Sequence, residues 1–180
     1  ITYACAALVP VADIASVSVT DNCRGTVIIT VADQVSPGAC ANKYSITRTW
    51  TATDICGNSS TSAQIITVDD TVPPVITGTP MPITYACAAL VPVADIASVS
   101  ATDNCAGTVT VTLSETKMPI DNPLEYVLTR TWTAVDACGN TSSAVQTITV
   151  KDTEPPTGTA PANISLNCDV ALPAPNPALV

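Results

Sequence analysis

The sequence lacks histidine and phenylalanine altogether and has few charged residues. None of its 180 residues is histidine, and only 12% are Asp, Glu, Lys or Arg. A nucleophilic triad needs a base beside the nucleophile, and without histidine only carboxylates or lysines remain for that role. The sequence also fits a zinc site poorly, because it has no histidine and no two cysteines have the CxxC spacing of paired zinc ligands. These absences argue against an enzyme, and we expect no catalytic residue.

Positive charge and long apolar runs are also scarce. The chain has 6 basic and 15 acidic residues and a formal net charge of −9. A chain of this charge repels nucleic acid and anionic membranes, so neither is an expected partner. No run of about eighteen apolar residues is present, so no segment is expected to span a bilayer. Ile1 does not open a charged stretch followed by an apolar one, which places any export signal outside this sequence.

An internal repeat is the strongest pattern in the chain. Residues 1–18 recur unchanged as residues 83–100, an offset of 82. Three cysteines keep this offset, because Cys5, Cys23 and Cys56 return as Cys87, Cys105 and Cys138. We predict a first repeat at 1–72, a linker at 73–82, a second repeat at 83–154, a linker at 155–162, and the start of a third repeat at 163–180.

Apolar and polar residues alternate along several short stretches of each repeat. Val27, Ile29 and Val31 alternate with small polar residues, and Tyr44 and Ile46 begin a similar pattern. A period of two indicates half-buried β-strands, and no stretch has a helical period. Short strands, turn residues and Pro-rich joints predict an all-β fold of tandem immunoglobulin-like antiparallel β-sandwiches joined by short Pro-rich linkers. The strands expected in the first repeat lie near 1–5, 16–20, 26–33, 44–54 and 64–68.

The eight cysteines predict disulfides and therefore an oxidising, extracellular location. In the immunoglobulin topology, the loop after 16–20 and the loop after 44–54 lie at the same end of the sandwich. We therefore expect a Cys23–Cys56 bond and its copy, and a further bond between the cysteines at the opposite end. The expected pairs are Cys23 with Cys56, Cys105 with Cys138, and Cys5 with Cys40.

Two cysteines have no partner in this scheme. Asn122 stands 82 residues after Cys40, so Cys87 is left over as a buried free thiol or as a cross-link to another chain. Cys168 belongs to the start of the third repeat, and its partner is expected beyond the sequence.

Each repeat also places one arginine and one tryptophan on the face of a strand that is expected to be buried. An acidic residue lies on the inward face of the preceding predicted strand, where it becomes a cross-strand neighbour if the two strands form a hairpin. We predict two partly buried ion pairs, with the tryptophans as the main core residues. The pairs are Asp33 with Arg48 and Glu115 with Arg130, and the tryptophans are Trp50 and Trp132.

Acidic residues gather at the two predicted joints between repeats. They supply oxygen ligands where two domains meet, and calcium bound there would stiffen an array of domains. The alternative is an ordinary solvated linker that binds no ion. The candidate ligands are Asp69 and Asp70 at the first joint and Asp152 and Glu154 at the second.

Four phrases of the chain carry a family resemblance: "ATDNC", "TRTWTAVDACGN", "QTITVKDTEPP" and "PANISLNC". Together they resemble the HYR-like, immunoglobulin-like tandem repeats of long secreted surface proteins of Bacteroidota, including gliding-motility adhesins. The resemblance implies β-sandwiches, export by type IX secretion, and a role in stalks or adhesive filaments at the cell surface. Such repeats usually carry four cysteines, so Asn122 is a departure.

The same resemblance suggests a site of modification. Asp70-Thr71-Val72 is similar to the Asp-Thr-aliphatic sequence at which such bacteria attach O-glycans, which makes Thr71 a candidate. Asp152-Thr153-Glu154 does not fit that pattern.

Three functions remain open from the sequence. The first is a structural repeat segment of an extracellular stalk, adhesin or filament, whose partners are the neighbouring repeats. The second is an adhesive module that binds glycans or proteins through 28–46, where the two repeats differ most. The third is a self-assembling fibre subunit in which 163–168 adds a strand to a neighbour's sheet.

Overall fold

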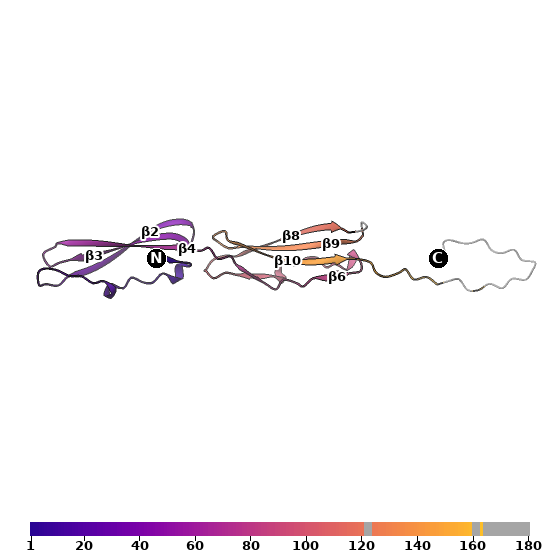
Figure 1. Ribbon diagram of the computed structural model, residues 1–180, viewed down its shortest axis with the longest axis horizontal. Helices are drawn as coiled ribbons and strands as arrows, with labels where there is room; N and C mark the ends of the chain where they lie inside the picture. The colour runs from indigo at the N-terminus through magenta and orange to yellow at the C-terminus, as the bar shows by residue number, and fades with distance from the viewer. Residues whose placement is uncertain (121–123, 160–162, 164–180) are drawn as a thin grey trace, which may run out of the picture.

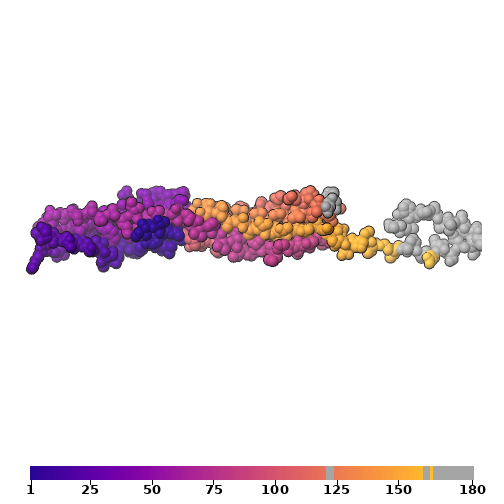
Figure 2. Space-filling view, in the orientation of Figure 1, coloured from indigo at the N-terminus to yellow at the C-terminus, as the bar shows by residue number. Residues whose placement is uncertain are grey.

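The computed structural model describes residues 1–120, 124–159 and 163. In this part of the chain the secondary structure consists of β-strands and four single turns of 3₁₀ helix, and no α-helix is present. Figure 1 shows two slender β units arranged end to end, and in Figure 2 they form one continuous rod. The predicted all-β fold of tandem sandwiches is confirmed.

The first unit is built on one four-stranded sheet. Its strand order is β1-β4-β3-β2, and β1 runs parallel to β4 while the other pairs are antiparallel. Two 3₁₀ turns lie in the segment that connects β1 to β2. The elements are β1 (Thr2–Tyr3), η1 (Ala6–Leu8), η2 (Ile14–Ser16), β2 (Ile28–Cys40), β3 (Lys43–Thr53) and β4 (Ser59–Asp69).

The second unit repeats this sheet and adds a smaller one. The order β6-β10-β9-β8 matches that of the first unit, strand for strand. A separate two-stranded sheet pairs β5 with β7. The elements are β5 (Val75–Thr77), β6 (Ile83–Tyr85), η3 (Ala88–Leu90), η4 (Ile96–Ser98), β7 (Ser100–Thr102), β8 (Thr110–Pro119), β9 (Tyr126–Val135) and β10 (Thr141–Val150).

The stretch 73–82, expected to be a linker, contributes a strand to the second unit. Val75 pairs with Thr102, and Thr77 pairs with Ser100. Val-Ile-Thr is a β-branched run that suits a strand, although it stands directly after two prolines. The second unit therefore begins at β5, eight residues earlier than predicted. The proposed start of a third repeat falls almost entirely outside the described residues.

The first unit has no counterpart of the β5–β7 sheet. Residues 18–20 occupy the place of β7 but are not a strand, so the strand expected at 16–20 is wrong in this unit. The reason is that a strand needs a hydrogen-bonded partner, and no described strand pairs with 18–20 as β5 pairs with β7. Trp132 is only 1% exposed, whereas its copy Trp50 is only partly buried. The prediction that both tryptophans are main core residues therefore holds for Trp132 alone.

Both predicted ion pairs are present. Asp33 lies directly opposite Arg48 in the β2–β3 hairpin, and the guanidinium donates two hydrogen bonds of 2.8 and 2.9 Å to the carboxylate. Glu115 lies opposite Arg130 in the same way, with a Nε–Oε1 distance of 2.7 Å. The hydrogen bonds from Arg48 lower the pKa of the Asp33 carboxyl below its ordinary value of 3.8.

The two members of the first pair should contribute unequally to stability. The Arg48 side chain is 6% exposed and that of Asp33 is 36% exposed. Asp33→Ala leaves the guanidinium buried with the Pro10 carbonyl as its remaining partner, and it should lower the free energy of unfolding by about 1–3 kcal/mol. Arg48→Met should cost less, because the thioether fills the space and water can hydrate Asp33. Urea unfolding of the two variants would contradict this ranking if Arg48→Met were the more damaging.

Candidate functional site

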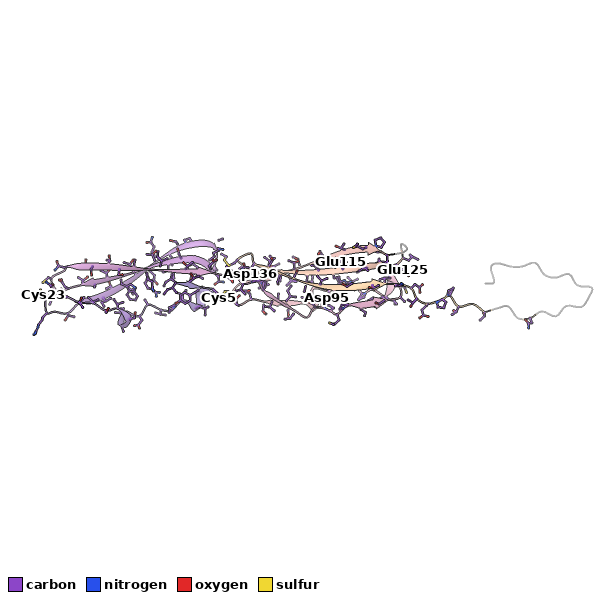
Figure 3. All side chains as sticks on the ribbon, viewed as in Figure 1. Cys5, Cys23, Asp95, Glu115, Glu125 and Asp136 are labelled. Atoms are coloured by element: carbon purple, nitrogen blue, oxygen red, sulfur yellow. A yellow bond between two sulfur atoms is a disulfide. The ribbon has the colours of Figure 1, made fainter. Side chains whose placement is uncertain are left out.

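The feature that distinguishes this molecule is the joint between its two units. In Figure 3, Cys5 of the first unit and Asp136 of the second lie close together at the middle of the rod. The residues that meet there come from the segment after β1, the β2–β3 and β9–β10 turns, the end of β4 and the loop after β7. We call this set the joint: Cys5, Cys40, Asn42 and Asp70 from the first unit, and Cys105, Cys138 and Asn140 from the second.

Two disulfides cross the joint. One bonds Cys5 to Cys105 and the other bonds Cys40 to Cys138, and the Cα–Cα distance is 5.2 Å in each. Cys5 and Cys105 are buried, with 5% and 6% of their surface exposed. The two units are therefore covalently linked at two points in addition to the chain itself.

These bonds overturn the predicted pairing. Cys105 does not bond to Cys138, Cys5 does not bond to Cys40, and Cys23 and Cys56 are exposed free thiols. The expected placement was correct in one respect, since the loops that hold Cys23 and Cys56 lie so close together that a methyl group added at Gly25 would contact the Ile55 side chain. The error lay in closing each unit on itself, because the cysteines at one end of a unit bond to those at the adjoining end of its neighbour.

Two asparagines hold the units together beside the disulfides. Asn42 is 4% exposed; its Oδ1 accepts from the Ala6 amide at 3.0 Å, and its Nδ2 donates to the Ala106 carbonyl at 2.9 Å. Asn140 Nδ2 donates across the joint in the other direction, to the Asp70 carbonyl at 3.1 Å. Because buried amide groups are costly to leave unpaired, these contacts fix the relative position of the units.

The sequence Asp-x-Cys-Gly-Asn forms the turn that presents one cysteine of each unit. Asp136 Oδ1 accepts from the amides of Cys138 and Asn140 at 2.8 and 2.9 Å, and Oδ2 accepts from the Asn140 side chain at 2.8 Å. Gly139 has a φ of 88°, a value that favours glycine. Asp54 accepts from the amide and side chain of Asn58 in the same way in the first unit. The repeated aspartate is therefore a turn residue that orients a cysteine.

The Asp136 turn should make the joint sensitive to acid. Burial alone would raise the pKa of Asp136, but hydrogen bonds from the Asn140 side chain and from the backbone of 138–140 outweigh it and lower that pKa below 3.8. A carboxyl whose pKa is lower in the folded than in the unfolded state stabilises the folded protein. This contribution is complete above the unfolded pKa and is lost as the pH falls through the folded pKa. The gap in unfolding free energy between wild type and Asp136→Asn should therefore be widest at neutral pH and close in acid. Urea titrations across this range test the expectation, and a gap that widened in acid would contradict it.

The predicted calcium ligands do not come together. Asp69 forms an ion pair with Lys43 at 3.1 Å, and Asp152 accepts from the Glu154 amide at 3.0 Å in an exposed turn. Asp70 is 3% exposed and lies within 4.8 Å of Asp103 and Cys105, measured between their ligand atoms. Because the Cys105 sulfur is in a disulfide, only two carboxylates remain, whereas calcium takes about six to eight oxygen ligands. Calcium at the joint stays a prediction.

Three further predicted residues can be placed or excluded. Cys87 is an exposed thiol, so the buried alternative is wrong. Thr71 is exposed, as a modified side chain must be, although its glycosylation stays a prediction. Cys168 and the segment 164–168 lie outside the described residues.

None of the helical turns in the described part of the chain is long or apolar enough to cross a membrane.

No curated protein sequence matches the chain. Residues 1–68 and 75–150 each match the family described as HYR-like domain with 4 cysteines. The second match begins at β5, in agreement with the strand that 73–82 contributes to the second unit. Disulfides and domains of this kind are typical of extracellular proteins. The chain belongs to the family of HYR-like domains with four cysteines and contains two consecutive copies of that domain.

Proposed function

We propose that this chain is a force-bearing segment of an extracellular stalk, adhesin or filament, and that its role is structural rather than catalytic. The observation that carries the proposal is the pair of disulfides across the joint. They add two covalent connections between neighbouring repeats to the one that the backbone makes. A rod of such repeats carries tension without depending on the folding stability of each unit.

The positions of the cysteines determine the path of a pulling force. Tension applied at Ile1 passes through Cys5 and across the disulfide into Cys105, so it bypasses the chain between them. The bypassed segment includes almost the whole first unit, because the two cysteines are 100 residues apart in sequence. The second disulfide, 98 residues apart in sequence, bridges the joint from the tip of β2. Two bridges also oppose rotation of one unit against the other, which a single bridge would allow.

Single-molecule pulling through the two ends of the chain tests this proposal. Extended chain measures about 3.3–3.6 Å per residue. The bypass of 100 residues should make the fully stretched oxidised molecule shorter than the reduced one by about 330–360 Å. Reduction with dithiothreitol in the same apparatus supplies the matched control.

The competing pairings give different lengths. Bonds within the units, Cys23–Cys56 and Cys105–Cys138, would each bypass 33 residues, from 56 − 23 and 138 − 105. The shortfall would then be about 220–240 Å. Equal lengths of the oxidised and reduced molecules would overturn the force-bearing role.

The finer setting is also part of the proposal. We infer a surface protein of the Bacteroidota type, exported by type IX secretion, because the repeats and their cysteines resemble those of long secreted adhesins. The neighbouring repeats of the same chain are its partners, and Thr71 beside the joint is a site for an O-glycan. Peptide mass spectrometry of the native protein would detect a sugar on Thr71, and an unmodified Thr71 would remove that part of the proposal.

A further inference from the structure

We propose that the outer end of the first unit is a docking site for the trailing end of another repeat, which supplies two cysteines and one β-strand. We call the site the acceptor end: residues 18–20, Cys23, Asp54, Cys56 and Asn58. We call its counterpart the donor end, represented at the joint by Cys5, Cys40 and Asn42 of the first unit and by β5, the strand that follows the first unit in the chain. This inference rests on the geometry of the joint and does not require the mechanical role.

The second unit shows the acceptor end in its occupied state. Each acceptor residue has a copy 82 positions later, and every one of those copies lies at the joint or next to it. Cys105 and Cys138 are bonded to the first unit, and Asn140 donates to the Asp70 carbonyl. β7, the copy of 18–20, is paired with β5. In the described part of the chain, no disulfide or strand from another unit occupies the same groups of the first unit.

Burial differs between the two ends in the way that docking predicts. Cys105 is 6% exposed and Cys23 is an exposed thiol, while Asp136 is 9% exposed and Asp54 is less deeply buried. The two ends are nearly identical in sequence, so their composition does not explain the difference. Figure 3 places Cys23 at the free tip of the rod.

The first unit has a groove at the position that β5 occupies in the second unit. It has a volume of about 220 Å³ and lies between residues 17–20 and the start of β4, with Trp50 and Ala52 on its floor. In the second unit β5 occupies the corresponding position, paired with β7 and in contact with β10, the copy of β4. Ala134, the copy of Ala52, has no exposed surface there. The groove therefore fits a short extended strand of the Val-Ile-Thr type.

The cysteines determine which kind of repeat can form both disulfides with the acceptor end. By equivalence with the joint, Cys23 takes the cysteine of the Cys5 type, and Cys56 takes the cysteine of the Cys40 type. The second unit carries only the first of these, Cys87, because Asn122 stands at the position of Cys40. The proposed occupant is therefore a repeat with both cysteines, like the first unit, and a second copy of this chain offers a single bond.

Each bond that forms is a two-electron oxidation. One thiol of the acceptor end and one of the donor end lose their hydrogens, and a sulfur–sulfur bond joins them. The two electrons and two protons pass to a disulfide oxidant such as glutathione disulfide, whose own bond breaks to give two thiols.

The test joins two complete chains, each able to react at one end only. The acceptor chain carries Cys87→Ser and Cys168→Ser. The donor chain carries Cys23→Ser, Cys56→Ser, Cys168→Ser and Asn122→Cys, and the matched control donor keeps Asn122. Acceptor and donor are mixed in a buffer of reduced and oxidised glutathione, and the products are mapped by non-reducing peptide mass spectrometry and by amide hydrogen exchange.

The two-cysteine donor should give a dimer with two bonds, one from Cys87 to Cys23 and one from the thiol introduced by Asn122→Cys to Cys56. The control donor should give only the Cys87–Cys23 bond. The doubly bonded dimer should persist at roughly tenfold or more higher thiol concentration, because the second bond forms within an already tethered pair. Amide exchange at 18–20 should slow in both dimers as residues 157–159, which hold the position of β5 after Pro156, fill the groove.

Three results would overturn the proposal. They are a dominant Cys23–Cys56 bond within the acceptor, a dimer bonded mainly from Cys87 to Cys56, and no dimer with the two-cysteine donor. Pulling experiments on the single chain are independent of all three, because they use only the joint already present. Failure of docking and failure of the force-bearing role are therefore separate outcomes.

Discussion

Removing both disulfides of the joint is expected to have the largest effect of any change in this protein. Cys5→Ser with Cys105→Ser removes one bond, and Cys40→Ser with Cys138→Ser removes the other. Each bond closes a loop of about 100 residues, and its loss should cost about 2–5 kcal/mol of unfolding free energy. The quadruple variant should lose more than either double variant, which urea unfolding monitored by tryptophan fluorescence would measure.

The overall shape of the molecule should change only when both disulfides are removed, whereas its stability should fall with the loss of either one. Either disulfide alone keeps the units aligned, because Asn42 and Asn140 still bond across the joint. With both bonds gone the units are held by non-covalent contacts alone, and small-angle scattering should show a bent ensemble in place of a rod. Cys23→Ser with Cys56→Ser is the matched control, since both thiols are exposed and the change should stay within about 0.5 kcal/mol. A control as damaging as the joint variants would contradict the pairing.

Trp132→Ala should cost far more than Trp50→Ala, although the two tryptophans lie in nearly identical sequences. Trp132 is 1% exposed, and its truncation should cost about 3–5 kcal/mol through lost burial and the cavity left behind. Trp50 lies on the floor of the open groove, where water already reaches it and no closed cavity would form. Its truncation should cost roughly half as much or less, since the cost follows the buried area lost.

This comparison isolates the contribution of the small β5–β7 sheet. Thermal unfolding of the two variants in oxidised protein gives the two losses directly. Equal losses would mean that β5 adds nothing to the burial of Trp132. In the docked dimer proposed above, the cost of Trp50→Ala should rise towards that of Trp132→Ala, because a strand then covers the groove.

Local patterns were enough to predict the long strands of each repeat and the ion pairs. A period of two, carried by β-branched residues, identifies a strand and its buried face without reference to the rest of the chain. Asp33 and Arg48 could be paired for the same reason, because the two strands of a hairpin bring facing residues together. These features depend on residues that are near one another in the sequence.

The disulfides of the joint could not be predicted in this way, because the repeated sequence does not show which cysteines bond to each other. When every unit has cysteines at both ends, bonds within one unit and bonds between neighbours use the same residues at the same spacing. Asn122 was the informative departure. Pairing within units leaves Cys87 without a partner in its repeat, whereas pairing between units leaves Cys23 and Cys56 free at the outer end of the first unit and Cys87 free at the outer end of the second.

The strand β5 was missed for a related reason. Pro73 and Pro74 mark a boundary, and the residues that follow were interpreted as a linker. The boundary is real, but it separates the first unit from a strand of the second. The contacts with β7 and β10 assign Val75–Thr77 to its unit, and they join residues that are far apart in the sequence.

Peptide mapping of the oxidised, unreduced protein tests the central claim most directly. Trypsin cleaves after Lys and Arg and releases 25–43 with Cys40 as its single cysteine and 131–151 with Cys138 as its single cysteine. The structure predicts one species in which these two peptides are joined, and reduction should separate them. Recovery of 25–43 joined to 1–24, or of 131–151 joined to 49–117, would show that each repeat closes on itself and would contradict the covalent joint.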